Sequence, residues 1–187
     1  MGRWEPDAVG RLQRAALELY GERGFESTAV ADIAELAGLT ERTFFRYFAD
    51  KREVLFFGSD SLMELFESTV ANAPGSQSPI DAVGEALQAA AGFFEGRREH
   101  ARKRQAVIAA NPSLQERELI KLASLAAAVA GALRNRGVGD PAALLTAEAG
   151  ITVFKVAFDI WVDVANDRAF ADVMRKTLDE LRAVTGA

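Results

Sequence analysis

The sequence predicts an all-α protein of about nine helices, because its apolar residues recur at helical spacing and no segment alternates as a strand does. Val30, Ile33, Ala34 and Ala37 show the spacing most clearly, at i, i+3, i+4 and i+7. Gly38 follows them, at the position where glycine commonly ends a helix. Similar helix-ending and helix-starting residues separate the periodic segments along the whole chain.

The composition is that of a globular protein rather than of a secreted or membrane protein. The chain has 187 residues, of which 49% are hydrophobic and 26% charged, enough for one or two small domains. It contains no cysteine, which excludes disulfides, thiolate metal sites and cysteine nucleophiles. The N-terminus lacks an apolar signal core, and the longest apolar run, 122–133, is too short to span a bilayer. We therefore expect a cytoplasmic protein with no membrane partner, no metal and no cofactor.

Residues 28–51 are expected to form a helix-turn-helix motif, two short helices joined by a tight turn. Thr28 stands where the N-cap of the first helix belongs, and Thr40 caps the second. Phe44 and Phe48 repeat at i, i+4 and mark the buried side of the second helix. Exposed aromatic residues beside arginine suit a helix in the major groove, where arginine pairs with guanine edges and hydroxyl groups with phosphates. The side chains left facing outward or sideways are Glu41, Arg42, Thr43, Phe45, Arg46 and Tyr47.

The charge of this segment also favours DNA. The net charge of the chain is -5, but binding depends on the local field rather than on the sum. Between residues 42 and 52 the cations Arg42, Arg46, Lys51 and Arg52 face only one anion, Asp50. We expect a basic DNA-binding face on an acidic protein.

The remaining helices follow from the same periodicity. A helix from about Pro6 to Gly24 precedes the motif, and Arg3 lies in a short arm before it. Asp50 begins a capping box that opens one long helix as far as Val70, and 73–79 forms a loop. The expected domains are 1–52, which contains the helix-turn-helix motif, and 53–187, which is helical throughout. Helices are expected at about 80–94, 99–110, 114–136, 141–165 and 169–184.

The run GLTERTFFRYFADKREVL resembles the signature of the TetR family of bacterial transcriptional regulators, and the residues before it resemble the first two helices of that family. The match covers roughly residues 1–55. It implies a homodimer that binds a double-stranded DNA operator and responds to a small-molecule effector. Position 45 usually holds tyrosine in the family, and Phe45 lacks that hydroxyl. The resemblance implies base-edge contacts from Glu41, Arg42 and Phe45 and phosphate contacts from Thr28, Thr43, Tyr47 and Lys51; Thr40 and Arg46 complete the expected DNA-binding set.

The two C-terminal helices carry more apolar surface than one packing partner needs. The segment 141–165 has two apolar stripes, and 169–184 is also broadly apolar. Either both stripes are internal core, or these helices meet the same pair of a second subunit in a four-helix bundle, which we expect. Such a dimer places its recognition helices about 34–36 Å apart. The expected interface residues are Val153, Ala157, Ile160, Val164, Val173, Leu178 and Leu181.

A small-molecule pocket is expected among the middle helices. The resemblance favours it, since aromatic residues at helical spacing are more often core than pocket. The candidate lining residues are Phe93, Phe94, Val107, Leu122, Phe154, Phe158 and Trp161.

These features favour a DNA-binding transcriptional regulator, a repressor released from a palindromic operator by a small hydrophobic ligand. The alternative is a helical module that binds a lipid or another small molecule and has lost DNA binding. We expect no enzyme, because the sequence has no nucleophile elbow, phosphate loop, dinucleotide motif or metal-ligand pattern.

Overall fold

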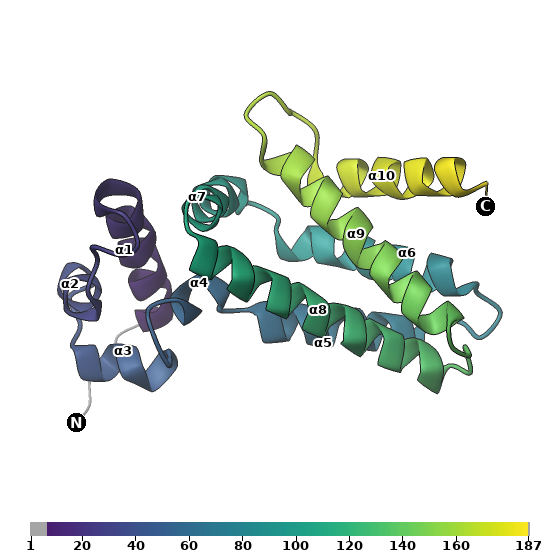
Figure 1. Cartoon of the computed structure of the whole chain (residues 1–187), viewed down its shortest axis with the longest axis horizontal. Coiled ribbons are helices and arrows are strands. Elements are labelled where there is room, and N and C mark those ends of the chain that lie inside the picture. Colours follow the sequence, from purple (N-terminus) through teal and green to yellow (C-terminus); the bar gives the residue numbers. More distant parts are fainter. Residues whose placement is uncertain (1–6, 187) are drawn as a thin grey trace. The chain divides into compact units, whose positions relative to one another are not determined.

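The structure is a computed structural model that describes residues 7–186, so Arg3 lies outside the described residues. This part of the chain contains ten α-helices and no strand (Figure 1). It divides into two compact units. The first unit combines the residues up to Phe57 with Lys103–Glu118, and the second combines Gly58–Arg102 with the residues from Leu119 onward.

The first unit begins with four helices, which are α1 (Ala8–Arg23), α2 (Val30–Leu36), α3 (Glu41–Tyr47) and α4 (Glu53–Phe56). They enclose a core in which Leu12, Ile33 and Phe44 are fully buried. Ile33 lies on the predicted apolar face of α2, and Phe44 lies on the predicted buried side of α3. The local periodicity therefore predicted both faces of the helix-turn-helix motif.

The single long helix expected after this motif is divided into two helices in the structure. Asp50 lies before α4, whose N-cap residue is Arg52, and its Oδ1 accepts from the backbone N–H groups of Arg52 at 2.7 Å and Glu53 at 3.3 Å; the Glu53 side chain pairs with Arg117, so the predicted capping box is only half formed. Helix α4 ends at Phe56, and α5 (Ser59–Asn72) starts separately. Gly58 between them has φ 93°, a left-handed conformation that glycine adopts readily and that a continuous helix excludes. This break adds one helix to the expected number.

The first unit also contains a helical hairpin, Lys103–Glu118, from the end of α7 (Arg98–Ala109) and the start of α8 (Pro112–Asn135). Its side chains Val107, Ile108 and Leu114 are buried in the same core as α1–α4. The expected division at residues 52 and 53 therefore misses this hairpin. A second stretch of chain, far along the sequence, completes the first unit.

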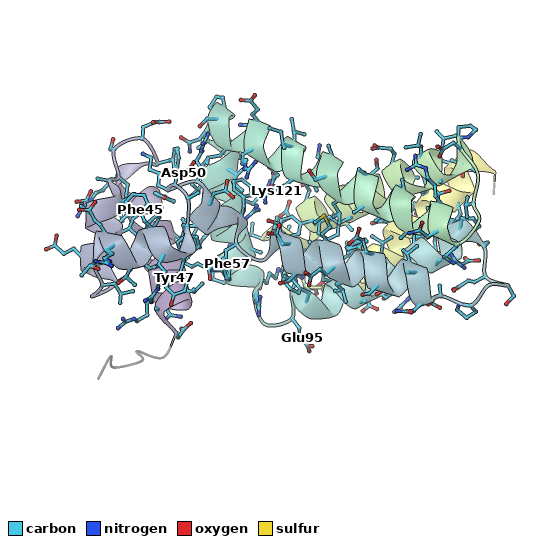
Figure 2. The ribbon with its side chains drawn as sticks, turned by 90° about the horizontal axis from the view of Figure 1, so that it is seen from below. Phe45, Tyr47, Asp50, Phe57, Glu95 and Lys121 are labelled. Carbon is cyan, nitrogen blue, oxygen red and sulfur yellow. The ribbon has the colours of Figure 1, made fainter. Side chains whose placement is uncertain are left out.

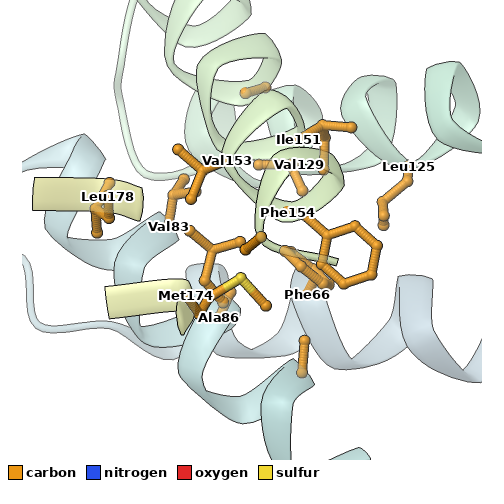
Figure 3. Close-up of a cluster of buried hydrophobic side chains, with 14 of the residues drawn as sticks. Phe66, Val83, Ala86, Leu125, Val129, Ile151, Val153, Phe154, Met174 and Leu178 are labelled. Atoms are coloured by element: carbon orange, nitrogen blue, oxygen red, sulfur yellow. The ribbon is translucent and has the colours of Figure 1, made fainter. Parts of the chain in front are cut away.

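The second unit contains α5, α6 (Pro79–Phe93), α9 (Ala142–Val162), α10 (Phe170–Thr185) and most of α8. Helix α6 packs against α5, α9 and α10 and is therefore central. Its approach to α9 is close, because a Cβ atom added to Gly150 would lie 2.3 Å from Cγ1 of Val83. Buried side chains from all five helices form one core (Figure 3). No helix among residues 7–186 combines the length and the apolar character that crossing a membrane requires.

Candidate nucleic-acid interface

Helix α3 is anchored on one side and exposed on the other. Phe44 is fully buried and contacts Phe48, the C-cap residue, with ring centroids 5.1 Å apart. Phe45 is 53% exposed and Tyr47 39% exposed, although both are large apolar rings (Figure 2). Apolar side chains on an anchored and otherwise polar helix mark a surface for a partner. The exposed residues of α3 are Glu41, Arg42, Phe45, Arg46 and Tyr47.

The N-terminus of α3 is fixed by two threonine residues. Oγ1 of Thr40 accepts a hydrogen bond from the backbone N–H of Thr43 at 3.2 Å, the N-cap interaction that the sequence predicts. The two hydroxyl groups lie 3.0 Å apart. Thr40 therefore shapes the start of the helix, and Thr43 presents its hydroxyl beside the cap.

Two arginine residues give α3 its positive charge, and they differ in their partners. Nη2 of Arg46 donates to the Tyr47 hydroxyl at 2.8 Å, and its guanidinium carbon lies 4.7 Å from the centroid of that ring. Arg42 is exposed and has no hydrogen-bond or ion-pair partner among the described residues. Nη2 of Arg52 lies 2.6 Å from Oδ2 of Asp50, and these hydrogen bonds hold the pKa of that carboxyl below its usual range. Arg42 is therefore the cation of α3 most available to a ligand.

Thr28 does not occupy the position that the sequence suggested. It is 2% exposed, and Ala29 is the N-cap residue of α2. The Thr28 hydroxyl donates to the carbonyl of Gly24 at 2.8 Å, at the end of α1. The N–H of Ala29 is bound instead by Asp32 Oδ2 at 3.0 Å. The predicted cap at Thr28 is therefore wrong, because its hydroxyl faces the end of α1, and the phosphate contact of Thr28 stays a prediction.

Lys51 is also turned inward. Its Nζ donates to the carbonyl oxygens of Phe25 at 2.8 Å, Glu26 at 3.2 Å and Thr28 at 3.1 Å. The buried hydroxyl of Tyr20 donates to the carbonyl of Lys51 at 2.6 Å, and burial raises the pKa of this phenol well above its usual range. The predicted phosphate contact of Lys51 is therefore not available in this conformation.

Most of the expected ligand-binding residues meet in one aromatic cluster of the second unit. Phe94 lies at its centre, with ring centroids 5.6–6.1 Å from those of Phe154, Phe158, Trp161 and Phe170. Trp161 and Phe170 stack at 4.5 Å and 18°. Most of these pairs meet edge to face, the arrangement that aromatic rings prefer in a packed interior.

Of the other three expected ligand-binding residues, Phe93 touches the edge of this cluster, with its ring centroid 5.3 Å from that of Phe94, and Leu122 and Val107 lie elsewhere. Phe93 is half-buried under the guanidinium of Arg97, which lies 5.3 Å from its ring centroid. Leu122 packs against the core of the second unit from its edge. Val107 belongs to the core of the first unit, whereas the other six residues lie in the second unit. Helical spacing showed that Val107 is buried but not in which core.

The expected dimer surface also needs correction. Val153, Ala157, Val173 and Leu178 are buried in the core of their own chain, so their side chains are not available to a second subunit. Val153 and Leu178 are among the core side chains that Figure 3 labels. The other expected residues remain accessible: Ile160 is 38% and Val164 77% exposed, and Leu181 is half-buried. The exposed side of α9 adds Leu145 and Val156 to them.

Two arginine residues of the first unit make polar contacts that had no signal in the sequence. Nη1 of Arg104 lies 3.0 Å from Oε1 of Glu118, and its Nε donates to the carbonyl of Leu55 at 2.7 Å. Nε of Arg117 lies 2.7 Å from Oε1 of Glu53. The Arg104–Glu118 pair joins the two helices of the hairpin, whereas the Arg117–Glu53 pair and the bond from Arg104 to Leu55 attach the hairpin to the α4 segment. Their partners lie far apart in the sequence, so spacing alone does not reveal them.

Comparison with protein families finds two matches. Residues 12–56 match the family model described as bacterial regulatory proteins, tetR family. Residues 77–186 match the model of the MftR C-terminal domain. Together the two matches span both units of the structure.

Two curated relatives support this assignment. The chain is 38% identical over 82 residues to the HTH-type transcriptional regulator TcmR of Streptomyces glaucescens, a match that spans 44% of the chain and only 36% of that protein. It is 27% identical over 161 residues to MftR of Mycobacterium tuberculosis, covering 86% of the chain and 81% of that protein.

Solved structures share the fold. Thermus thermophilus FadR, a TetR family repressor in complex with lauroyl-CoA, is 24% identical with a TM-score of 0.55, covering 92% of both chains. Bacillus subtilis FadR, a transcriptional regulator in complex with stearoyl-CoA, is 17% identical with a TM-score of 0.64, covering 92% of this chain and 96% of that one. With a helix-turn-helix motif followed by a helical domain that matches over most of its length, the chain belongs to the TetR family of bacterial regulatory proteins.

Proposed function

We propose that the protein is a dimeric transcriptional repressor that binds its operator through α3 and leaves it when a small hydrophobic ligand binds the second unit. The observation that carries the DNA-binding part is α3 itself. Its buried side fixes the helix. On its other side Arg42 has no hydrogen-bond or ion-pair partner among residues 7–186, and Phe45 is 53% exposed although its ring contacts Phe44. Arginine in this position suits the O6 and N7 atoms of guanine, and the Phe45 ring suits a thymine methyl group.

The aromatic cluster of the second unit supports a ligand with a long apolar part. Phe94, Phe154, Phe158, Trp161 and Phe170 offer only apolar ring surface, apart from the indole N–H. Two proteins of the same fold hold acyl-CoA thioesters in their solved structures. We therefore take acyl-CoA thioesters as the ligand class.

The exposed stripe of α9 supports the dimer. Leu145, Val156 and Ile160 of α9, and Val164 just after its end, are between 38% and 77% exposed, and all are large apolar side chains. A second copy that covers this stripe removes the apolar surface from water, the main favourable term in association. Two copies also supply the two recognition helices that a palindromic operator needs.

The test is a selection of random duplexes by the purified protein, followed by release of the selected duplex with lauroyl-CoA or stearoyl-CoA. Enrichment of a palindrome with half-sites about one helical turn apart supports the dimeric regulator. Free coenzyme A is the control, since it lacks the acyl chain. Failure to enrich any sequence at low salt contradicts DNA binding and leaves the lipid-binding module as the function.

Replacing Arg42 with alanine is expected to weaken operator binding by about 1–3 kcal/mol, roughly 5- to 150-fold, and to relax the preference at one base pair. The reason is that Arg42 has no other partner among the described residues, so the N–H donors of its guanidinium group are available to a base. Fluorescence anisotropy with single-base variants of the selected duplex measures both effects. Arg175→Ala, which removes an exposed arginine of α10, is the control and is expected to bind as wild type does. Wild-type affinity of Arg42→Ala contradicts the assignment.

Ile160→Glu is expected to shift the protein from dimer to monomer, because a carboxylate at the centre of an apolar interface loses its hydration without gaining a partner. Size-exclusion chromatography with light scattering gives the mass of each species. Leu119→Glu is the matched control, since Leu119 is 58% exposed on α8 and outside the proposed surface. An Ile160→Glu protein that stays dimeric places the interface elsewhere.

A further inference from the structure

Lys51 places its ammonium group among three backbone carbonyls. Nζ lies 2.8–3.2 Å from the carbonyl oxygens of Phe25, Glu26 and Thr28, and 4.4 Å from the centroid of the Phe25 ring. A lysine ammonium has three N–H donors. All three are therefore used within the unit, and no donor is left over for a DNA phosphate.

The carbonyls that bind Lys51 belong to a single short turn. Phe25, Glu26 and Thr28 lie between the end of α1 and the start of α2. Thr28 closes the other side of this turn by donating to the carbonyl of Gly24 at 2.8 Å. Phe25 and Thr28 are 3% and 2% exposed, whereas Glu26 between them is exposed, so water has little access to two of the three carbonyls that accept from Lys51. Without the lysine, carbonyls in this turn would lose their partner at a point where water replaces it poorly.

The position of Lys51 in the chain allows this contact to connect the two ends of the helix-turn-helix motif. The turn immediately precedes α2, and Lys51 follows the C-cap of α3 by three residues. One side chain thus ties the entry of the helix-turn-helix motif to its exit. The carbonyl of Lys51 in turn accepts from Tyr20 of α1 at 2.6 Å, so both ends are fixed to the same helix.

We propose that Lys51 is a positioning residue that fixes the orientation of α3 from within the unit, rather than a residue that binds phosphate. This inference rests on the proposed function, since α3 is taken as the helix that reads the operator. Base contacts depend on exact placement of a few side chains, whereas phosphate contacts supply affinity that does not depend on sequence. A misplaced α3 therefore loses discrimination before it loses its attraction to DNA.

The experiment compares full-length Lys51→Met and Lys51→Arg with wild type on two probes, the duplex recovered by selection and a random-sequence duplex of equal length. For Lys51→Met we expect the affinity for the selected duplex to fall at least tenfold, with the affinity for the random duplex and the salt dependence of both unchanged. A protein that is only partly unfolded would lose both affinities by the same factor. Lys51→Arg keeps the charge but replaces the compact ammonium with a planar group, and we expect it to lose discrimination as well.

Hydrogen exchange of the free proteins gives a measurement without DNA. We expect exchange in the peptide that covers residues 24–33 to be at least tenfold faster in Lys51→Met, with exchange in α9 unchanged. Arg46→Met, which removes an exposed cation of α3, is the matched control and is expected to leave exchange in 24–33 as in wild type.

A phosphate contact gives the opposite pattern and would overturn the proposal. In that case Lys51→Met lowers the slope of log affinity against log salt by about 0.9, exchange in 24–33 stays at the wild-type rate, and Lys51→Arg binds like wild type. Failure of the proposed function looks different, because wild-type protein then binds neither duplex. The exchange measurement still decides in that case whether Lys51 holds the turn.

Discussion

Replacing Gly150 with alanine is expected to destabilise the second unit by about 2–3 kcal/mol, although alanine is the better helix former. The added Cβ atom would lie 2.3 Å from Cγ1 of Val83, well inside van der Waals contact. Val83 is fully buried and β-branched, so it has no free rotamer into which to retreat. Either α9 moves away from α6, or the core around Val83 loses its packing.

Gly131 provides the matched control, because it also lies inside a helix of this unit but has no atom within 4 Å of an added Cβ. Gly131→Ala is expected to stabilise α8 by up to about 1 kcal/mol. Hydrogen exchange of α6 and α9 at increasing urea concentrations measures both changes. Equal stabilities for the two variants would mean that α6 and α9 are farther apart than the structure shows.

Replacing Leu114 with alanine is expected to destabilise the DNA-binding unit by about 2–4 kcal/mol, although Leu114 lies more than fifty residues beyond the helix-turn-helix motif. Leu114 is fully buried in the core that also contains Leu12 and Phe44. Its removal leaves a cavity between the hairpin and α1–α4. A loss of this size is a large share of the free energy of unfolding of a small domain, and we therefore expect it to abolish operator binding.

Leu119→Ala, five residues later in α8, is the control, since that side chain is 58% exposed and its loss is expected to change stability by less than about 0.5 kcal/mol. The two units need not unfold together, so a single transition midpoint is not the right measure. Hydrogen exchange resolved by peptide reports on each unit separately. We expect faster exchange in α1–α3, with exchange in α9 unchanged. Faster exchange confined to α8 would show that the hairpin is not part of the first unit's core.

Local features of the sequence predicted the helix-turn-helix motif well. The apolar face of α2, the buried Phe44 and Phe48 and the cap at Thr40 all depend on neighbours within four residues. The break at Gly58 had a local signal too, a glycine directly after two phenylalanines, but the capping box at Asp50 suggested one continuous helix.

Long-range contacts explain the corrected assignments. Lys51 is a residue that binds phosphate in many contexts, and only the folded chain shows that carbonyls of a distant turn use its donors; the Thr28 hydroxyl donates to the nearby carbonyl of Gly24. Val107, Val153 and Leu178 are buried as their periodicity indicates. Periodicity reports the face of a helix but not its neighbour, and it therefore cannot separate the core of one unit from that of the other, or either from a dimer interface.

The division of the first unit into two stretches of chain affects the order in which the protein forms during synthesis. Helices α1–α4 leave the ribosome first, but Val107, Ile108 and Leu114, which complete their core, are translated only after all of residues 58–102. Until then the nascent chain carries a recognition helix on an unfinished core, with apolar surface open to chaperones and to other chains. Closing the core also requires the intervening segment to form a loop, which costs entropy and slows folding. The growing polypeptide therefore completes its DNA-binding unit only after a large part of the ligand-binding unit has been made.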